Sequence, residues 1–301
     1  MITRLRFLAT LLLLTSACGG GDDDPTGPGP MPEGTVTEVT GGEFVAPENA
    51  FWDSARNVWY IADFGEAMGA PPQPGFLARL AADGTVMESR WIDNVGDSPK
   101  GMAIIGDNLY VADNTQILEI DLNAEAITDT IPVVGAAFLN GMDTDGQALF
   151  IADSGTDALY RFEPGDIQAN LIFQDAGLGA PNGVIVRSDN EIIVASLGSF
   201  PPTAALPGAL LSVQIPGVVT SIGGVSGALD GLLEDGSGGY FVSDFNGIIY
   251  QVDSDGTDTV VRNLAATDSL SSVADIGYDP ASRRFMVPDL FGGAVYQFIA
   301  P

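Results

Sequence analysis

One position at the start of an apolar segment recurs at intervals of 40 to 52 residues, and five of its six side chains carry oxygen. The members are Glu48, Asn140, Asn182, Asp230 and Asp275, with Lys100 at the equivalent position between the first two. Carboxylate and carboxamide oxygens are the ligands that hard divalent cations prefer, and Ca²⁺ accepts irregular sets of them that water completes. If the fold gathers these segments, they form an oxygen-lined site for Ca²⁺ or another divalent cation.

The chain contains no histidine, and Cys18 is its only cysteine. The missing histidine excludes Ser-His-Asp triads, imidazole bases and His-ligated zinc, iron or copper sites. A single cysteine excludes an intramolecular disulfide, so the fold depends on its core and its sheet hydrogen bonds. Oxygen ligands are therefore the metal chemistry that remains.

A second recurring feature is a short apolar run that ends in Asp, or once in Ser. The runs end at Asp63, Asp113, Asp153, Ser196, Asp244 and Asp289, which lie 40 to 50 residues apart. A period of about 45 residues built from short alternating segments is typical of a propeller, in which each repeat forms one four-stranded sheet. We therefore predict an all-β fold, a six-bladed β-propeller with four antiparallel strands per blade, over residues 34–301.

The two ends of this domain complement each other. The sixth repeat supplies only three predicted strands, the first of them over 274–279, whereas residues 34–40 form one strand before the first repeat. Placing that N-terminal strand at the outer edge of the last blade closes the ring. Closure removes the free sheet edges that an open array would expose.

Comparison among the repeats separates structural residues from functional ones. An aspartate that ends the apolar run in five repeats is expected to cap a turn through the backbone. The first strand of each blade is expected to line the central channel of the propeller. At the start of this channel strand the side chain varies, while the next residue is glycine in four repeats, at positions 101, 141, 183 and 231. An alternative is that each Asn-Gly or Asp-Gly pair simply forms a turn at the entry to a strand. That alternative explains each pair alone, but it does not explain why the side chain varies while the glycine after it is kept.

Three of these strand starts resemble motifs of the SMP-30/gluconolactonase family. The segment PENAFWD (47–53) is similar to its EGPxWD opening, PNGV (181–184) to its PNG segment, and LDGL (229–232) to its PDG segment. The segment LNGM (139–142) lies where that family has a further asparagine. The resemblance covers residues 34–301. It implies a six-bladed propeller with a divalent-cation site, often calcium, that hydrolyses lactones or related esters.

The resemblance assigns roles to the varying residues. It implies metal ligation by Glu48, Asn140, Asn182 and Asp230. A bound cation would polarise a carbonyl and acidify a water, and Asp230 is then the candidate catalytic base, with Asp275 as the second catalytic candidate. A carboxylate fully engaged with the metal is a poor base, so the two assignments to Asp230 compete.

The substrate side departs from the lactonase pattern. Where that branch has an arginine two residues before the middle asparagine, this chain has Phe138. We predict that substrate binding falls to Phe138 at this position and to Lys100, the one lysine of the chain. A non-catalytic NHL-like propeller that binds a protein or polymer at the cell surface is the competing hypothesis, because propellers host both kinds of function. Long Pro-rich loops over 65–74 and 197–207 are expected to overhang the channel mouth, as lids or insertions.

The N-terminus has the features of a bacterial lipoprotein signal. Residues 1–17 contain two arginines, an apolar run too short to cross a bilayer, and small residues before Cys18. We predict that Cys18 carries the lipid, the alternative being an ordinary signal peptide with an incidental cysteine. Residues 18–33 are rich in Gly, Asp and Pro and are expected to form a loose tether.

The charge balance bounds the partners. The chain has 40 acidic and 11 basic residues, a net charge of −29. Such a field repels nucleic acid and anionic membrane surfaces, although a well-solvated surface explains the charge equally well. We expect the protein to be a monomer that acts on a small-molecule substrate. Its only contact with the membrane is expected to be the lipid on Cys18. The expected location is the bacterial cell envelope, and Gly19 after the cysteine favours the outer membrane.

The anchor prediction is tested by replacing the lipidated residue. Cys18→Ser removes the thiol that would carry the lipid, so the exported protein is expected to move from the membrane fraction to the soluble fraction. Fractionation followed by immunoblotting measures this. Variant protein that stays with the membranes would contradict the lipid anchor.

Overall fold

The computed structural model describes residues 34–67 and 73–300; the predicted signal peptide, the tether and Cys18 lie outside the described residues. Within them, the regular elements are strands apart from the 3-10 helix η1 (Ala176–Leu178) and the single turn α1 (Leu264–Thr267). Neither of these helices has the length and apolar character needed to span a lipid bilayer. The predicted all-β class is therefore confirmed.

Six antiparallel four-stranded sheets follow one another along the chain, and each predicted repeat forms one blade. Strand pairing follows chain order within each of the first five blades, and the first strands of these five blades contact one another in turn. Blades one to three comprise β2 (Pro47–Asp53), β3 (Val58–Asp63), β4 (Phe76–Ala81) and β5 (Val86–Asp93); β6 (Pro99–Ile105), β7 (Asn108–Asp113), β8 (Gln116–Asp121) and β9 (Ala126–Pro132); and β10 (Leu139–Thr144), β11 (Leu149–Asp153), β12 (Ala158–Phe162) and β13 (Asn170–Gln174).

The remaining three blades continue the ring, so the predicted six-bladed architecture is confirmed. They comprise β14 (Pro181–Ser188), β15 (Glu191–Ser196), β16 (Gly208–Gln214) and β17 (Val218–Gly227); β18 (Leu229–Glu234), β19 (Tyr240–Asp244), β20 (Ile248–Val252) and β21 (Asp258–Asn263); and β22 (Gly277–Asp279), β23 (Arg284–Asp289), β24 (Ala294–Ile299) and β1 (Thr37–Glu38).

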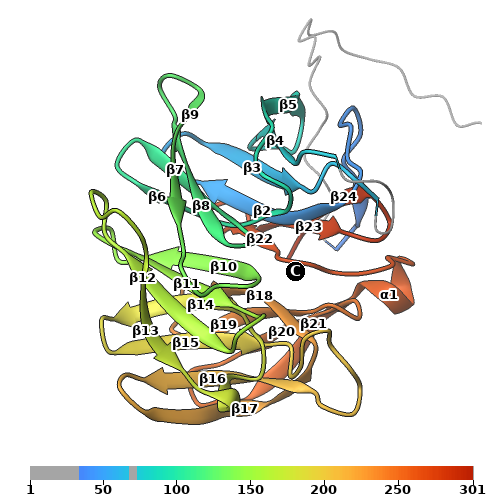
Figure 1. The fold of residues 1–301 in the computed structure, drawn as a ribbon. Helices are drawn as coiled ribbons and strands as arrows, with labels where there is room; N and C mark the ends of the chain where they lie inside the picture. The colour runs from blue at the N-terminus through green and yellow to red at the C-terminus, as the bar shows by residue number, and fades with distance from the viewer. Residues whose placement is uncertain (1–33, 68–72, 301) are drawn as a thin grey trace, which may run out of the picture. The chain divides into compact units, whose positions relative to one another are not determined.

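The N-terminal strand completes the sixth blade, as predicted. β1 pairs antiparallel with β24 as the outer strand of that sheet. Backbone hydrogen bonds from Gly34 N to Ile299 O (3.0 Å) and from Val39 N to Val295 O (2.8 Å) extend the pairing on both sides of β1. In Figure 1 the blue first blade consequently lies beside the red strands of the last one.

The innermost strand of blade six is shorter than the predicted 274–279, because its first residues pair with another blade. Asp275 N donates to Glu48 O (2.9 Å), and Ala50 N donates to Asp275 O (3.0 Å), in a parallel bridge to β2. The ring is thus closed twice, by the outer strand β1 and by the inner strands of blades six and one.

The hydrophobic core lies between the blades. Six clusters each combine residues of two adjacent blades; one contains Tyr110 of blade two and Leu149 of blade three, and another contains Met286 of blade six and Trp59 of blade one. Burying a large side chain of this kind contributes about 1.5–3 kcal/mol. Because each blade packs on two neighbours, the ring needs all six blades to bury its apolar faces.

The channel-strand glycines lie where the inner strands of neighbouring blades come closest. A Cβ on Gly141 would stand 2.5 Å from Asn182 O, and one on Gly183 would stand 2.5 Å from Asp230 O. A Cβ on Gly101 would likewise stand 2.4 Å from the Asn140 carbonyl oxygen. The glycine is therefore constant because a neighbouring backbone occupies the space of its side chain.

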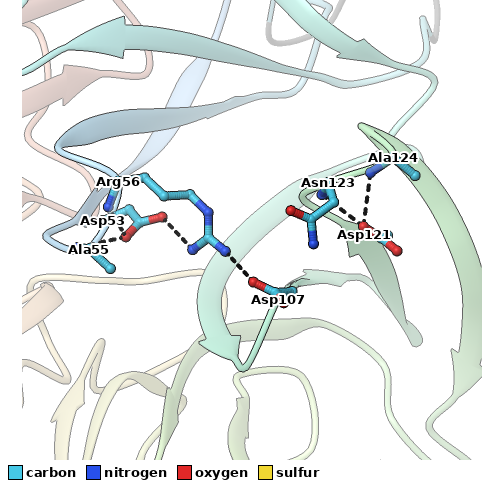
Figure 2. A network of polar contacts seen from close by, with 7 residues as sticks. All are labelled: Asp53, Ala55, Arg56, Asp107, Asp121, Asn123 and Ala124. Carbon is cyan, nitrogen blue, oxygen red and sulfur yellow. Dashed lines mark hydrogen bonds and ion pairs between the residues drawn. The ribbon is translucent and has the colours of Figure 1, made fainter.

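Polar contacts join neighbouring blades at the turns between the first and second strands, as Figure 2 shows. Arg56 donates to Asp53 Oδ2 (3.1 Å) in its own blade and to Asp107 Oδ1 (2.8 Å) in blade two. Figure 2 also shows Asp121, which caps the turn between the third and fourth strands of blade two by accepting from Asn123 N at 2.8 Å. Because Asp107 is exposed, its ion pair contributes about 0.2–1 kcal/mol at most, and burial between the blades dominates.

The close approach of the inner strands predicts the effect of adding one methyl group. Gly141→Ala is expected to lower the free energy of unfolding by about 1–3 kcal/mol, because the new Cβ meets backbone atoms that cannot rotate away. Gly217→Ala is the control, since a Cβ there meets no atom within 4 Å, and about 0.5 kcal/mol or less is expected. Urea denaturation measures both; equal effects would contradict the packing argument.

Candidate metal and substrate site at the channel mouth

A bulge shapes the start of the inner strand in each of the first five blades. The pairing register shifts between Pro47 and Asn49 in blade one and between Leu139 and Met142 in blade three, with matching shifts in blades two, four and five. A bulge takes residues out of the ladder and re-aims their side chains. We call the six residues at these strand starts the channel ring: Glu48, Lys100, Asn140, Asn182, Asp230 and Asp275.

The aspartates that end the second strands hold the backbone that leads to this ring. Asp153 accepts from Gly155 N (2.9 Å), which confirms its turn-capping role, and also from Ala137 N (2.9 Å) and Phe138 N (2.8 Å), just before Asn140. Asp63, Asp113 and Asp289 bind backbone amides at 45–46, 97–98 and 271–272 in the same way. These carboxylates therefore fix the approach to the channel ring.

Four members of the channel ring line one pocket of about 330 Å³. They are the predicted metal ligands Glu48, Asn140, Asn182 and Asp230, contributed by blades one, three, four and five. All four side chains are buried. The structure thus brings together residues that are separated by up to 182 positions in the sequence.

Several oxygens in this pocket have no hydrogen-bond partner. They are Glu48 Oε2, Asn182 Oδ1 and Asp230 Oδ1, all buried. The side-chain amide nitrogen of Asn140 donates to Ser154 Oγ (3.2 Å). The side-chain carbonyl oxygen of Asn140 is left for another partner. Unpaired buried oxygens are costly, and a hard cation accepts such oxygens as ligands.

The donor set fits Ca²⁺ by its chemistry, with two carboxylates and two carboxamides. Residues 34–67 and 73–300 contain no group of three or more His, Cys, Asp or Glu side chains arranged to hold a metal ion. The set of Glu48, Asn140, Asn182 and Asp230 differs from such groups because half of its oxygens come from amides. Metal binding at this site stays a prediction.

The channel concentrates negative charge. Burial raises the pKa of Asp230 well above its usual range, and the charges of Glu48 and Asp275 raise it further, while the Asn182 amide opposes them. Burial also raises the pKa of Glu48, with Asp275 adding to the shift and Lys100 opposing it. Burial raises the pKa of Asp275 to about 7. A cation in the pocket would relieve this repulsion.

Lys100 does not line the pocket, and its side chain has no exposed surface. Its ammonium donates to Ser98 O (2.7 Å) and Asn114 Oδ1 (3.3 Å), and it lies 4.2 Å from the ring centroid of Phe138 and 5.6 Å from that of Phe64. Phe138 itself lines the pocket. Of the two predicted substrate-binding residues, Phe138 is therefore placed for contact and Lys100 lies behind the aromatic rings.

Asp275 lines a different cavity, of about 320 Å³, further along the inner strands. Asn49 lines the same cavity, and its amide donates to the Asp275 carboxylate. The two predicted catalytic carboxylates are therefore separated, because Asp230 faces the mouth pocket and Asp275 the inner cavity. Their charges interact, but a direct catalytic contact by Asp275 stays a prediction.

Sequence reasoning missed a second ring, which we call the mouth ring. Its members directly follow the ends of the second strands: Phe64, Asn114, Ser154, Leu197, Phe245 and Leu290. Four of them line the pocket, whereas Asn114 binds Lys100 and Ser154 binds Asn140. The signal was present, because this position varies from repeat to repeat just as the channel-strand start does.

One of the two long loops, 197–207, lies at the channel mouth as expected. Leu197, Phe200, Pro201 and Pro202 of the 197–207 loop line the pocket. In the 65–74 loop, residues 68–72 lie outside the described residues. Whether either loop acts as a lid stays a prediction.

A carboxylate of the inner cavity predicts a pH effect on stability. Asp143 accepts from Val186 N (2.8 Å), and burial raises its pKa to about 6. The folded protein therefore holds this proton more tightly than the unfolded chain, so stability falls as the pH rises from about 4 to 6. Asp143→Asn removes that loss, and its stability relative to wild type should rise across this window and then stay constant.

The expected rise is about 1–2 kcal/mol, less than the roughly 3 kcal/mol that two pKa units represent, because the side chain is only partly buried. Urea denaturation between pH 4 and 7.5 measures it. Asp166→Asn, at an exposed turn, is the control. A difference between Asp143→Asn and wild type that does not change with pH would contradict the prediction.

No protein-family model matches the chain, and no curated protein sequence matches it significantly. Solved structures are similar in fold. A gluconolactonase from Xanthomonas campestris matches with a TM-score of 0.67 at 14% identity, over 88% of this chain and 89% of that one. A structural-genomics target provisionally described as a gluconolactonase matches with a TM-score of 0.63 at 16% identity, over 90% and 93%.

A third similar structure is an auxiliary nutrient binding protein from Bacteroides thetaiotaomicron. Its TM-score is 0.65 at 10% identity, over 87% of this chain and 75% of that one. At such identities the likeness concerns the fold alone. The fold that the sequence motifs predicted is thus the six-bladed propeller that this chain shares with gluconolactonase-like structures.

Proposed function

We propose that this protein is a metal-dependent hydrolase of a small lactone or ester, with Ca²⁺ or another divalent cation at the channel mouth. One observation carries the proposal: four oxygen-bearing side chains from four blades line one pocket, and three of their buried oxygens lack a partner. The fold shared with gluconolactonase-like structures supports the same reaction class.

The residues of the site have different proposed roles, which follow from where their side chains lie. Glu48, Asn140, Asn182 and Asp230 would hold the cation, which supplies a Lewis acid that polarises the carbonyl and makes water more acidic. Asp230 would bind the cation through its unpaired Oδ1 and take the water proton through its second carboxylate oxygen. Asp275 does not touch the pocket and acts as a positioning residue, through its charge on Asp230.

The reaction is a balanced addition of water. The water oxygen forms a bond to the carbonyl carbon, and the bond from that carbon to the ring or ester oxygen breaks. The proton taken by Asp230 is returned to the leaving oxygen, which yields a hydroxy acid from a lactone or an acid and an alcohol from an ester. No oxidant or reductant is required.

Calcium titration tests the metal site. The protein is expected to bind Ca²⁺ with a Kd below about 1 mM, as extracellular sites do. Asn182→Ala should weaken binding at least about tenfold, because it removes one ligand oxygen. Asn123→Ala, an exposed asparagine in a turn, should leave binding unchanged. Calorimetry measures all three, and wild-type binding weaker than millimolar would sink the metal-dependent mechanism.

A non-catalytic binding role is the second candidate. The similar fold of an auxiliary nutrient binding protein and the exposed aromatic rings of Phe200 and Phe291 at the mouth favour it. Turnover distinguishes the two roles. Calcium-loaded protein that binds lactones and aryl esters without hydrolysing them would assign the pocket to capture rather than to catalysis.

A further inference from the structure

The mouth pocket has two chemically different zones. Its polar zone consists of the four channel-ring residues described above. The rest of the described lining is apolar and comprises Phe64, Phe138, Leu197, Phe200, Pro201, Pro202, Phe245, Leu290 and Phe291. We call these nine residues the apolar wall. A ligand that fits both zones carries a polar oxygen function at one end and a hydrocarbon body at the other.

The wall is a packed structure. Phe138 and Phe200 lie with ring centroids 4.6 Å apart, and Phe245 and Phe291 meet edge to face at 5.1 Å. Each pair joins side chains from two neighbouring repeats, and the Phe138 backbone is held by Asp153. Aromatic pairs in these geometries stabilise each other beyond simple burial, so the wall is preorganised for an apolar partner.

The described lining of the pocket carries no positively charged side chain, since it contains neither lysine nor arginine. Lys100 is nearby but lies behind the rings of Phe138 and Phe64, with its donors directed at Ser98 and Asn114. The chain's net charge of −29 adds a repulsive field. An acidic substrate would therefore have no cationic side chain to bind.

A polyhydroxylated substrate fits the wall no better. Each sugar hydroxyl that enters the pocket loses its hydrogen bonds with water. The phenylalanine, leucine and proline side chains of the wall offer no hydrogen-bonding group to replace them. Hydroxyl groups left unpaired on burial cost about 1–3 kcal/mol each. Alkyl or aryl groups gain from the same surface, because burial removes their apolar area from water.

We infer that the preferred substrates are neutral lactones or esters with an alkyl or aryl body, rather than sugar lactones or acidic sugars. This inference rests on the proposed hydrolase function. The carbonyl lies at the oxygen-lined floor and the hydrocarbon body lies against the apolar wall. A pocket of about 330 Å³ is near the lower end of the range for small-molecule sites, so the body is short.

A homologous substrate series tests the inference. The calcium-loaded protein is assayed with γ-butyrolactone, γ-hexalactone and γ-octalactone, which differ only in alkyl length, and with glucono-δ-lactone. We expect kcat/KM to rise about fourfold per added methylene until the pocket is full, the equivalent of about 0.8 kcal/mol. Glucono-δ-lactone is expected to be the poorest substrate. A flat alkyl series, or glucono-δ-lactone as the best substrate, would overturn the inference.

A wall variant links the selectivity to this surface. Phe291 is 55% exposed at the pocket lip, so Phe291→Ala should leave folding intact and reduce the rise per methylene by about half. Val218 is equally exposed, at 55%, on the outer strand β17. Val218→Ala should leave both the activity and the chain-length dependence unchanged. An unchanged slope in Phe291→Ala would remove the wall from substrate recognition.

A binding series separates this inference from the reaction itself. The γ-lactams of the same alkyl series keep the carbonyl and the hydrocarbon body but resist hydrolysis, and calorimetric titration measures their affinities. Affinity that rises with chain length while no lactone turns over would uphold the apolar wall and reject the hydrolase. Lactam affinity independent of chain length would reject the wall, whatever the lactones do.

Discussion

The close approach of the inner strands at the channel mouth is the constraint on which the rest of the structure depends. At Gly101, Gly141 and Gly183 the backbone of one blade fills the space of a side chain on the next. The residue before each of these glycines lies in a bulge, out of the sheet ladder. Convergence of the channel ring is therefore a consequence of how tightly the blades must close around a common axis.

The repeated aspartates turn that constraint into a defined geometry. Each of Asp63, Asp113, Asp153 and Asp289 ties the end of a second strand to the backbone that enters the first strand of its own blade. A charged acceptor bound to two or three amides is stronger than a neutral one. Each of these aspartates is followed directly by a mouth-ring residue, and the amides that it binds lie just before a channel-ring residue. The same structural motif therefore positions both rings.

The fold was predictable because a repeat contains its own comparison: the 45-residue period, the missing sixth-blade strand and the extra N-terminal one are all visible in the sequence. The convergence of Glu48, Asn140, Asn182 and Asp230 followed from the same logic. Within the apolar wall, Phe138 and the 197–207 loop were also indicated, whereas Phe64, Phe245, Leu290 and Phe291 were not, because an apolar residue after a strand is read as core when its blade is considered alone. The burial of Lys100 was also hidden, since the ring of Phe138 that covers it comes from the next blade.

Electrostatics argue that the two zones of the pocket act together. Glu48, Asp230 and Asp275 share a channel with one cation, Lys100, whose donors are already bound to Ser98 and Asn114. Solvent at the floor screens this repulsion, and the phenylalanine and proline side chains that line the approach leave less room for it. Within a low-dielectric site, charges interact far more strongly than in water. The apolar wall thus selects a hydrocarbon body and, by lowering the local dielectric, also strengthens the attraction of the oxygen-lined floor for a cation.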